Sequence, residues 1–280
     1  MLTETIPRLR ERISYSRSME CTLRDVLVGT LQYINFNKEI MTMLTHTIPR
    51  QLISTGNTKL NKAIEFGYLN EGLSLSPGDK SGYEMCAYRT EGCSKLCLDI
   101  QGRGVMTNVQ KSRHNKTMYF MNDKVKFMEQ LSDELLSRLL YAKRKGLRYA
   151  FRPNVFSDRE EFWRSGIMDD HPQIQFTDYT KNPYRMDKFL KSLLPRNYYL
   201  TFSRSETNDP ECENILSRGG NVAVVFKHFL PEYWFGYPVI DGDVHDLRFL
   251  DPQGVVVGLL AKGTAKKSNN AFIVNPLDKE

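Results

Sequence analysis

The sequence lacks several features that would place the protein in a familiar class. No run of eighteen apolar residues occurs, so no membrane-spanning helix is predicted. The N-terminal stretch MLTETIPRLRERISYSRSMEC has no apolar core of the kind found in secretory signals, which favours a cytoplasmic location. No Gly-x-Gly-x-x-Gly turn follows the first predicted strand, so the usual dinucleotide-binding fingerprint is missing.

The chain also lacks a strong excess of either charge. Its 39 Lys and Arg against 33 Asp and Glu leave a net charge of +6 over 280 residues. This balance favours acidic partners, such as nucleic acid or an anionic small molecule, only slightly. The hydrophobic content of 40% is that of an ordinary globular protein with no membrane contact.

Residues 1–50 predict an N-terminal helical appendage. Apolar residues recur at helical spacing from Leu23 to Leu44, and Pro49 ends the pattern. Residues 51–280 then form the second predicted domain, in which the character of the sequence changes.

In this second domain, predicted strands alternate with predicted helices. The strands are LSLS (73–76), LRYAF (147–151), IQFTDY (174–179), YYLTF (198–202), NVAVVF (221–226) and VVVGLLA (255–261). The longest predicted helix starts at a cap on Asn122 or Asp123 and closes at Gly146. Strands separated by helices imply parallel βαβ units, so we expect an α/β fold with a (β/α) barrel, complete or partial. A mixed open sheet is the alternative.

Polar side chains follow several consecutive predicted strands. In chain order they are Arg152, Asn154, Ser157 and Asp158, then Asp178 and Lys181, then Ser203, Arg204 and Glu206. Because chemistry in a parallel barrel gathers at the carboxyl ends of the strands, the series indicates a site for an anionic or polar ligand. Individual residues also fit structural roles, since Ser157 to Glu160 matches a helix capping box and Asp241-Gly242 matches a hairpin turn.

The segment MCAYRTEGCSKLC (85–97) holds three of the five cysteines, Cys86, Cys93 and Cys97. Cys93 and Cys97 are four residues apart, so a helical turn would place both sulfur atoms on one face. The Thr-Glu-Gly stretch before Cys93 can bend the chain back and bring Cys86 to the same point. A cytoplasmic location disfavours structural disulfides and favours metal binding.

Three interpretations of the cysteine triplet compete. An iron–sulfur cluster, most simply of the 4Fe–4S type, is suited by three cysteines and leaves one iron open for a substrate or cofactor. A zinc ion requires a fourth ligand, for which His114 is the local candidate. In the third interpretation the thiols bind no metal and are free buried cysteines, which are common in proteins.

The motifs of the second domain, taken together, resemble the phage gene-product-88 family. They are GLSLSPG, CAYRTEGCSKLCLDIQGRG, FRPNVFSD, FTDYTKNPYR, NYYLTFSRSE, NVAVVF and VIDGDVHDLRFLDPQGVVVGLLAKGTAKK. The resemblance runs in order from about Ser54 to Phe272. It implies a phage-encoded protein of the host cell cytoplasm and no particular activity.

The position of the triplet, directly after the first strand of a predicted β/α barrel, also resembles radical S-adenosylmethionine enzymes. That resemblance implies a 4Fe–4S cluster on Cys86, Cys93 and Cys97, with S-adenosylmethionine bound at its free iron. It makes Arg152, Asn154, Ser157 and Asp158 candidates for the ribose or carboxylate of that cofactor. The substrate side would then comprise Asp178, Lys181, Ser203, Arg204 and Glu206. The cysteine spacing departs from the family pattern, with x6 and x3 in place of x3 and x2.

These observations favour an iron–sulfur protein that acts on a nucleotide, nucleic acid or other anionic substrate. The residues assigned to catalysis are Asp158, Asp178, Lys181 and Glu206. The residues assigned to cofactor binding are Arg152, Asn154, Ser157, Ser203 and Arg204. A second hypothesis is a divalent-metal nuclease or phosphoryl-transfer enzyme built on Asp241, Asp243, Asp246 and Asp251 with Glu206 and Lys262. A third is a non-catalytic protein that binds nucleic acid or a host factor.

Overall fold

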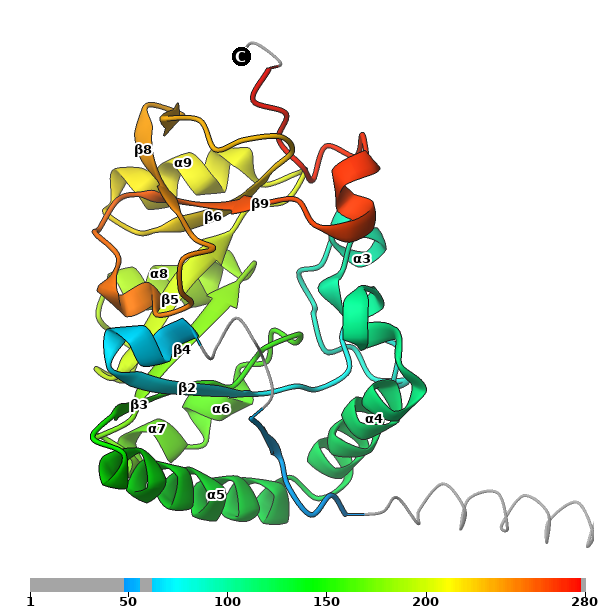
Figure 1. The fold of residues 1–280 in the computed structure, drawn as a ribbon, viewed down its shortest axis with the longest axis vertical. Helices are drawn as coiled ribbons and strands as arrows, with labels where there is room; N and C mark the ends of the chain where they lie inside the picture. Colours follow the sequence, from blue (N-terminus) through cyan, green and yellow to red (C-terminus); the bar gives the residue numbers. More distant parts are fainter. Residues whose placement is uncertain (1–47, 56–61, 278–280) are drawn as a thin grey trace, which may run out of the picture. The chain divides into compact units, whose positions relative to one another are not determined.

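Figure 1 shows the fold in a computed structural model, which describes residues 48–55 and 62–277. The chain divides into two units, Met1–Thr47 and Ile48–Glu280. The predicted helix from Leu23 to Leu44 and the cysteine at position 21 lie outside the described residues. No helix among the described residues is long and apolar enough to cross a bilayer.

The centre of the fold is a nine-stranded sheet with the order β1-β2-β3-β4-β5-β6-β9-β8-β7. The strands are β1 (Ile53–Ser54), β2 (Tyr68–Leu73), β3 (Arg148–Arg152), β4 (Gln175–Thr180), β5 (Tyr198–Ser203), β6 (Val222–Phe226), β7 (Tyr233–Trp234), β8 (Tyr237–Asp241) and β9 (Val256–Leu260). All neighbours from β2 to β8 in this order are parallel, whereas β1 and β7 pair antiparallel at the two edges. The expected α/β fold with a mostly parallel sheet is confirmed.

The sheet does not close on itself, so the complete barrel that the sequence allows is not formed. The edge strands β1 and β7 are two residues long and pair only with β2 and β8, so neither continues the sheet toward the other. Instead, aromatic side chains at the start of β2 and just before it meet the segment after β8. The Phe66 ring lies edge-on to His245 at 4.5 Å, and Tyr68 lies edge-on to Phe249 at 5.2 Å.

Helices cover the sheet and connect its parallel strands (Figure 1). The α-helices of the described residues are α3 (Glu91–Lys95), α4 (Thr107–Asn122), α5 (Lys124–Arg144), α6 (Glu161–Arg164), α7 (Ile167–Asp170), α8 (Pro183–Leu190) and α9 (Asp209–Ser217). The short 3-10 helices are η1 (Lys62–Phe66), η2 (Leu98–Ile100), η3 (Gly102–Val105), η4 (Arg248–Leu250) and η5 (Gly263–Lys267). Helix α5 packs against β3, α8 against β4 and β5, and α9 against β5 and β6.

Local signals explain where α5 begins and ends and where α8 begins. The Asp123 side chain accepts a hydrogen bond from the Lys126 amide at 3.2 Å and caps α5, and Gly146 follows that helix with a φ of 71°. Asn182 caps α8 by accepting from the amides of Tyr184 and Arg185, directly before a proline at the first helical position. The hairpin turn suggested at Asp241-Gly242 is wrong, because β8 and β9 are parallel.

The two faces of the sheet differ in character because side chains alternate along each strand. Phe151 on β3, Phe176 on β4 and Phe202 on β5 point to the helix-covered face and belong to the main hydrophobic core. The neighbouring positions on the other face carry Arg152 and Ser203, which line a cavity. The fold therefore directs one set of strand-end side chains into the core and the other into the cavity.

Candidate functional site

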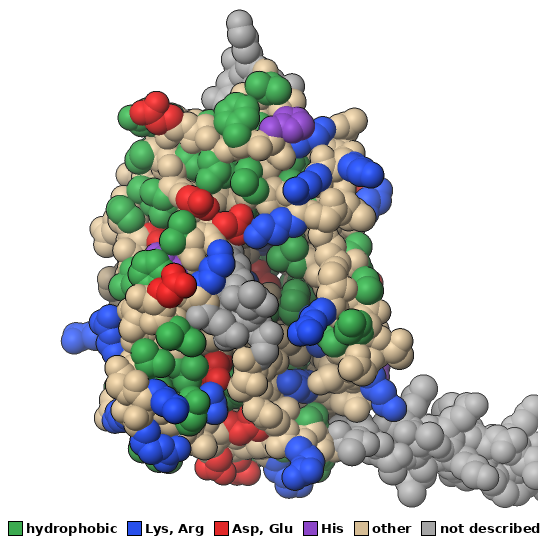
Figure 2. Space-filling view, in the orientation of Figure 1, with side chains coloured by type: hydrophobic (Ala, Val, Ile, Leu, Met, Phe, Trp, Pro, Cys, Tyr) green, Lys and Arg blue, Asp and Glu red, His purple; other side chains and the backbone are tan. Residues whose placement is uncertain are grey.

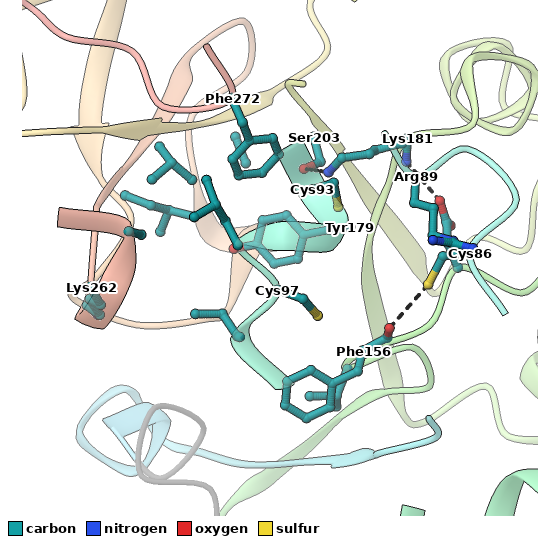
Figure 3. Close-up of a pocket in the computed structure, with 18 of the residues that line it drawn as sticks. Cys86, Arg89, Cys93, Cys97, Phe156, Tyr179, Lys181, Ser203, Lys262 and Phe272 are labelled. Atoms are coloured by element: carbon teal, nitrogen blue, oxygen red, sulfur yellow. Dashed lines mark hydrogen bonds between the residues drawn. The ribbon is translucent and has the colours of Figure 1, made fainter. Parts of the chain in front are cut away.

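A cavity of about 500 Å³ lies at the carboxyl ends of the parallel strands. Its walls include Arg152 from β3, Tyr179 from β4, Ser203 from β5 and Leu259 from β9. The segment 86–98, which follows β2, contributes a further wall (Figure 3). The site therefore lies at the end of the sheet where chemistry was expected.

All three thiols of the cysteine triplet line this cavity. Cys93 lies in helix α3, which ends at Lys95, so Cys97 lies beyond the helix at the start of η2. The two sulfur atoms therefore line the same cavity. They do not lie on one face of a helix, which is what the four-residue spacing predicts. Figure 3 shows the side chains of Cys86, Cys93 and Cys97 around the same space.

Cys86 is held by backbone groups on both sides of its sulfur atom. Its Sγ donates to the carbonyl oxygen of Phe156 at 3.3 Å and accepts from the amide of Gly78 at 3.4 Å. Burial raises the pKa of this thiol to about 12, and the nearby Asp158 adds to the shift. Burial also raises the pKa of Cys97. The Cys86 thiol therefore stays protonated at neutral pH unless a cation lies beside it.

The chain after Cys97 is anchored by the buried carboxylate of Asp99. Lys80 Nζ donates to Asp99 Oδ2 at 2.5 Å, Gln110 Nε2 donates to the same oxygen at 3.1 Å, and Arg113 pairs with Oδ1. Burial alone would raise the pKa of Asp99, but these hydrogen bonds and the charge of Arg113 outweigh it and lower the pKa. The third cysteine is thus fixed to helix α4.

The chain before Cys93 is anchored by Glu206, which follows β5. Its carboxylate accepts from the Thr90 hydroxyl at 2.7 Å and from the Gly92 amide at 2.6 Å. Thr90 itself caps α3, with its Oγ1 accepting from the Cys93 amide at 3.3 Å. Burial opposes ionisation of Glu206, yet the bonds from Thr90 and Gly92 lower its pKa. Glu206, predicted to act on substrate, instead contacts the cysteine segment.

Five of the other predicted residues line the cavity. They are Arg152, Ser157, Asp158, Lys181 and Ser203. Within this group, Asp158 pairs with the buried Arg185, and its Oδ2 accepts from the Lys181 amide at 2.9 Å. Two aromatic residues that line the cavity, Phe156 and Phe272, were not predicted from the sequence. Phe272 is brought to the cavity by the neighbouring Val274, whose backbone bridges to Phe226 at the end of β6.

Besides Glu206, three predicted residues do not line the cavity. Asp178 is fully buried on the helix-covered face and accepts from the Asn154 amide at 2.9 Å and from the Tyr198 hydroxyl at 2.8 Å. Asn154 also donates its side-chain amide to Asp178 at 2.8 Å. Arg204 pairs with Asp209 at 2.7 Å. Each of these side chains stabilises the strand ends behind the cavity wall.

Three of the carboxylates of the nuclease hypothesis are each paired with a different cation. The pairs are Asp243 with Lys262 at 2.7 Å, Asp246 with Arg152 at 3.1 Å and Asp251 with Arg248 at 3.3 Å. Across residues 48–55 and 62–277, no three His, Cys, Asp or Glu side chains are placed to hold one metal ion. In Figure 2, basic side chains are scattered among acidic and apolar ones over the visible face and form no continuous basic surface there.

Comparison with known protein families matches the family described as gene product 88 over residues 51–276. This range contains every motif that carried the resemblance in the sequence. No curated protein and no solved structure matches the chain.

Proposed function

The chain belongs to the gene product 88 family, and we propose that this protein holds an iron–sulfur cluster on Cys86, Cys93 and Cys97. The single observation that carries the proposal is that all three thiols of one short segment line one cavity at the strand ends. Three cysteines on separate surfaces, or packed singly in the core, could not bind one cluster together.

The donor set suits a cluster better than a single ion. Thiolates that share one zinc ion lie about 4 Å apart, because each zinc–sulfur bond is about 2.3 Å long. No three donors among the described side chains meet that requirement. A 4Fe–4S cluster takes each cysteine on a different iron and so accepts sulfur atoms that are more widely spaced.

The environment of the thiols supports the same assignment. The thiol of Cys86, with a pKa of about 12, is a poor nucleophile at neutral pH, which argues against direct thiol catalysis. Cationic iron would replace the proton on each sulfur atom and offset the burial of the charge. Asp99 and Glu206 fix the chain on either side of α3, so the cysteine segment is held in place before any cluster binds.

When bound, the cluster would supply a one-electron redox centre and an open iron for a ligand atom. The chain's own residues would bind and orient the ligand opposite the cysteines. Arg152, Ser157 and Asp158, which the radical S-adenosylmethionine resemblance assigns to the cofactor, line the cavity. Asn154 does not, so S-adenosylmethionine would be held by fewer contacts than the resemblance implies.

The test is the iron and sulfide content of anaerobically purified and reconstituted protein, compared between the wild type, Cys93→Ala and Cys212→Ala. Cys212 is the matched control, since it is buried in helix α9 and does not line the cavity. We expect about four irons per wild-type chain, an unchanged content in Cys212→Ala and a loss of at least half in Cys93→Ala. Equal iron in both variants would overturn the proposal, as would a colourless wild type that retains no iron.

A further inference from the structure

Four basic side chains line the cavity, and they differ in what neutralises them. Arg152 pairs with Asp246 and Lys262 pairs with Asp243. Arg89 pairs with Asp79 at 2.9 Å and with Glu84 at 3.0 Å. Lys181 is the exception, because its ammonium group has no carboxylate partner among the described residues. Its hydrogen bond goes to a hydroxyl group.

That hydroxyl belongs to Ser203, whose Oγ accepts from Lys181 Nζ at 2.6 Å (Figure 3). Because the oxygen accepts from the ammonium group, its own proton must point elsewhere, and Ser203 lines the cavity. The ammonium group also lies 5.3 Å from the centre of the Phe272 ring. The ammonium group of Lys181 and the hydroxyl group of Ser203 are therefore two neighbouring hydrogen-bond donors beside an apolar ring. Charge–charge interactions are stronger in such surroundings than in water.

The position of this pair is fixed by its surroundings. The Lys181 amide donates to Asp158, and Asp158 is clamped by the fully buried Arg185. Ser203 is the last residue of β5 and pairs with Ala223 of β6. The two donors are thus preorganised, which lowers the entropic cost of binding a ligand.

We propose that Lys181 and Ser203 form an oxyanion-binding subsite that receives a carboxylate or phosphate group of the molecule bound in the cavity. This inference rests on the proposed function only in taking the cavity as the reaction site, and the subsite itself needs no cluster. Arg152 and Lys262 are poorer anion receptors, because each would first have to give up its own aspartate. The net positive charge of the cavity wall is therefore concentrated at one point.

The experiment follows the backbone amide signals of residues 181 and 203 by NMR during titration with potassium phosphate or with potassium acetate at constant ionic strength. Saturable shifts with phosphate, acetate or both are expected in the wild type, and the effective anion identifies the group. Lys181→Met should weaken the apparent affinity by about tenfold or more, and Ser203→Ala by several-fold. Lys181→Arg, which keeps the charge, should retain most of the affinity and guards against misfolding of the methionine variant.

Lys188→Met is the matched control, since it removes the same charge from the exposed side of α8 and does not line the cavity. It should bind within about twofold of the wild type because a distant exposed charge is screened. Absence of saturable shifts with both anions would overturn the subsite, as would equal losses in Lys181→Met and Lys188→Met. Iron content is measured on the same samples. Anion binding by protein that takes up no iron would refute the cluster and leave the subsite standing.

Discussion

The carboxylate of Glu206 accepts a hydrogen bond from the Thr90 hydroxyl at 2.7 Å, across a sequence separation of 116 residues. Thr90 caps the short helix that carries Cys93, and Glu206 follows the strand that ends at Ser203. This contact joins the cysteine segment to the side of the cavity that carries Ser203. The two halves of the candidate site are therefore held to each other by one acidic side chain.

Glu206→Gln should loosen this connection without changing the shape of the side chain. The two hydrogen bonds to a charged acceptor become weaker, so we expect a loss of about 1–3 kcal/mol in the free energy of unfolding. Denaturant unfolding measures the loss, with the exposed Glu213→Gln as the control. A variant as stable as that control would show that the contact does not hold the segment.

Gly92→Ala should disturb the same contact by steric overlap. A Cβ atom at position 92 would overlap Asn270 Oδ1 and would lie 2.8 Å from the carboxylate oxygens of Glu206. Alanine favours helices by up to about 1 kcal/mol over glycine, so a net loss of stability would isolate the clash. We expect a lower melting temperature and reduced iron uptake. Lys95→Ala, on the exposed side of the same helix, should change neither by much.

Asp178→Asn should damage the fold and not the binding chemistry. The carboxylate accepts hydrogen bonds from the backbone and side chain of Asn154 and from the Tyr198 hydroxyl. The NH2 group of an asparagine would be a donor placed against these donors. We expect a loss of about 2–4 kcal/mol in the free energy of unfolding. Asp169→Asn, at an exposed site on α7, serves as the control. Full stability combined with lost anion binding would instead place Asp178 in the site.

The metal-free protein should show strongly pH-dependent alkylation at Cys86. A pKa of about 12 in place of its usual value near 9 leaves roughly a thousandth of the normal thiolate at pH 8. The rate of reaction with iodoacetamide, followed by peptide mass spectrometry, should rise about tenfold per pH unit up to pH 12. The unfolded chain should level off near pH 9. Equal rates in the folded and unfolded chains at pH 8 would contradict the burial of this thiol.

The same shift predicts how stability depends on alkaline pH. The folded state keeps the Cys86 proton after the unfolded state has lost it, so this group's contribution is fully present below pH 9. It is lost as the pH rises from about 9 through about 12. Cys212 has a raised pKa of about 12 for the same reason, burial, and should add to the effect.

Strand alternation explains which parts of the site could be predicted from the sequence. The ends of the strands were recognised, and Arg152, Lys181 and Ser203 do line the cavity. Asp178 and Arg204 were assigned to the same site because they lie near the carboxyl ends of β4 and β5. Adjacent residues of a strand point to opposite faces, so these two side chains lie behind the wall.

Helix α4 shows why part of the fold escaped prediction. Its buried residues include Arg113, Lys116 and Thr117, so no apolar stripe marks its inner face. Lys116 is buried because its Nζ donates to the Leu52 carbonyl at 2.7 Å. Helix α5 next to it was predictable, because Leu131 and Leu135 bury a regular apolar face and Asp123 caps its start.

The most direct measurement of the central claim is anomalous diffraction at the iron absorption edge from crystals of anaerobically reconstituted protein. The account predicts one compact anomalous peak in the cavity, in contact with the sulfur atoms of Cys86, Cys93 and Cys97. A cavity without anomalous signal, or iron bound away from these three sulfur atoms, would contradict it.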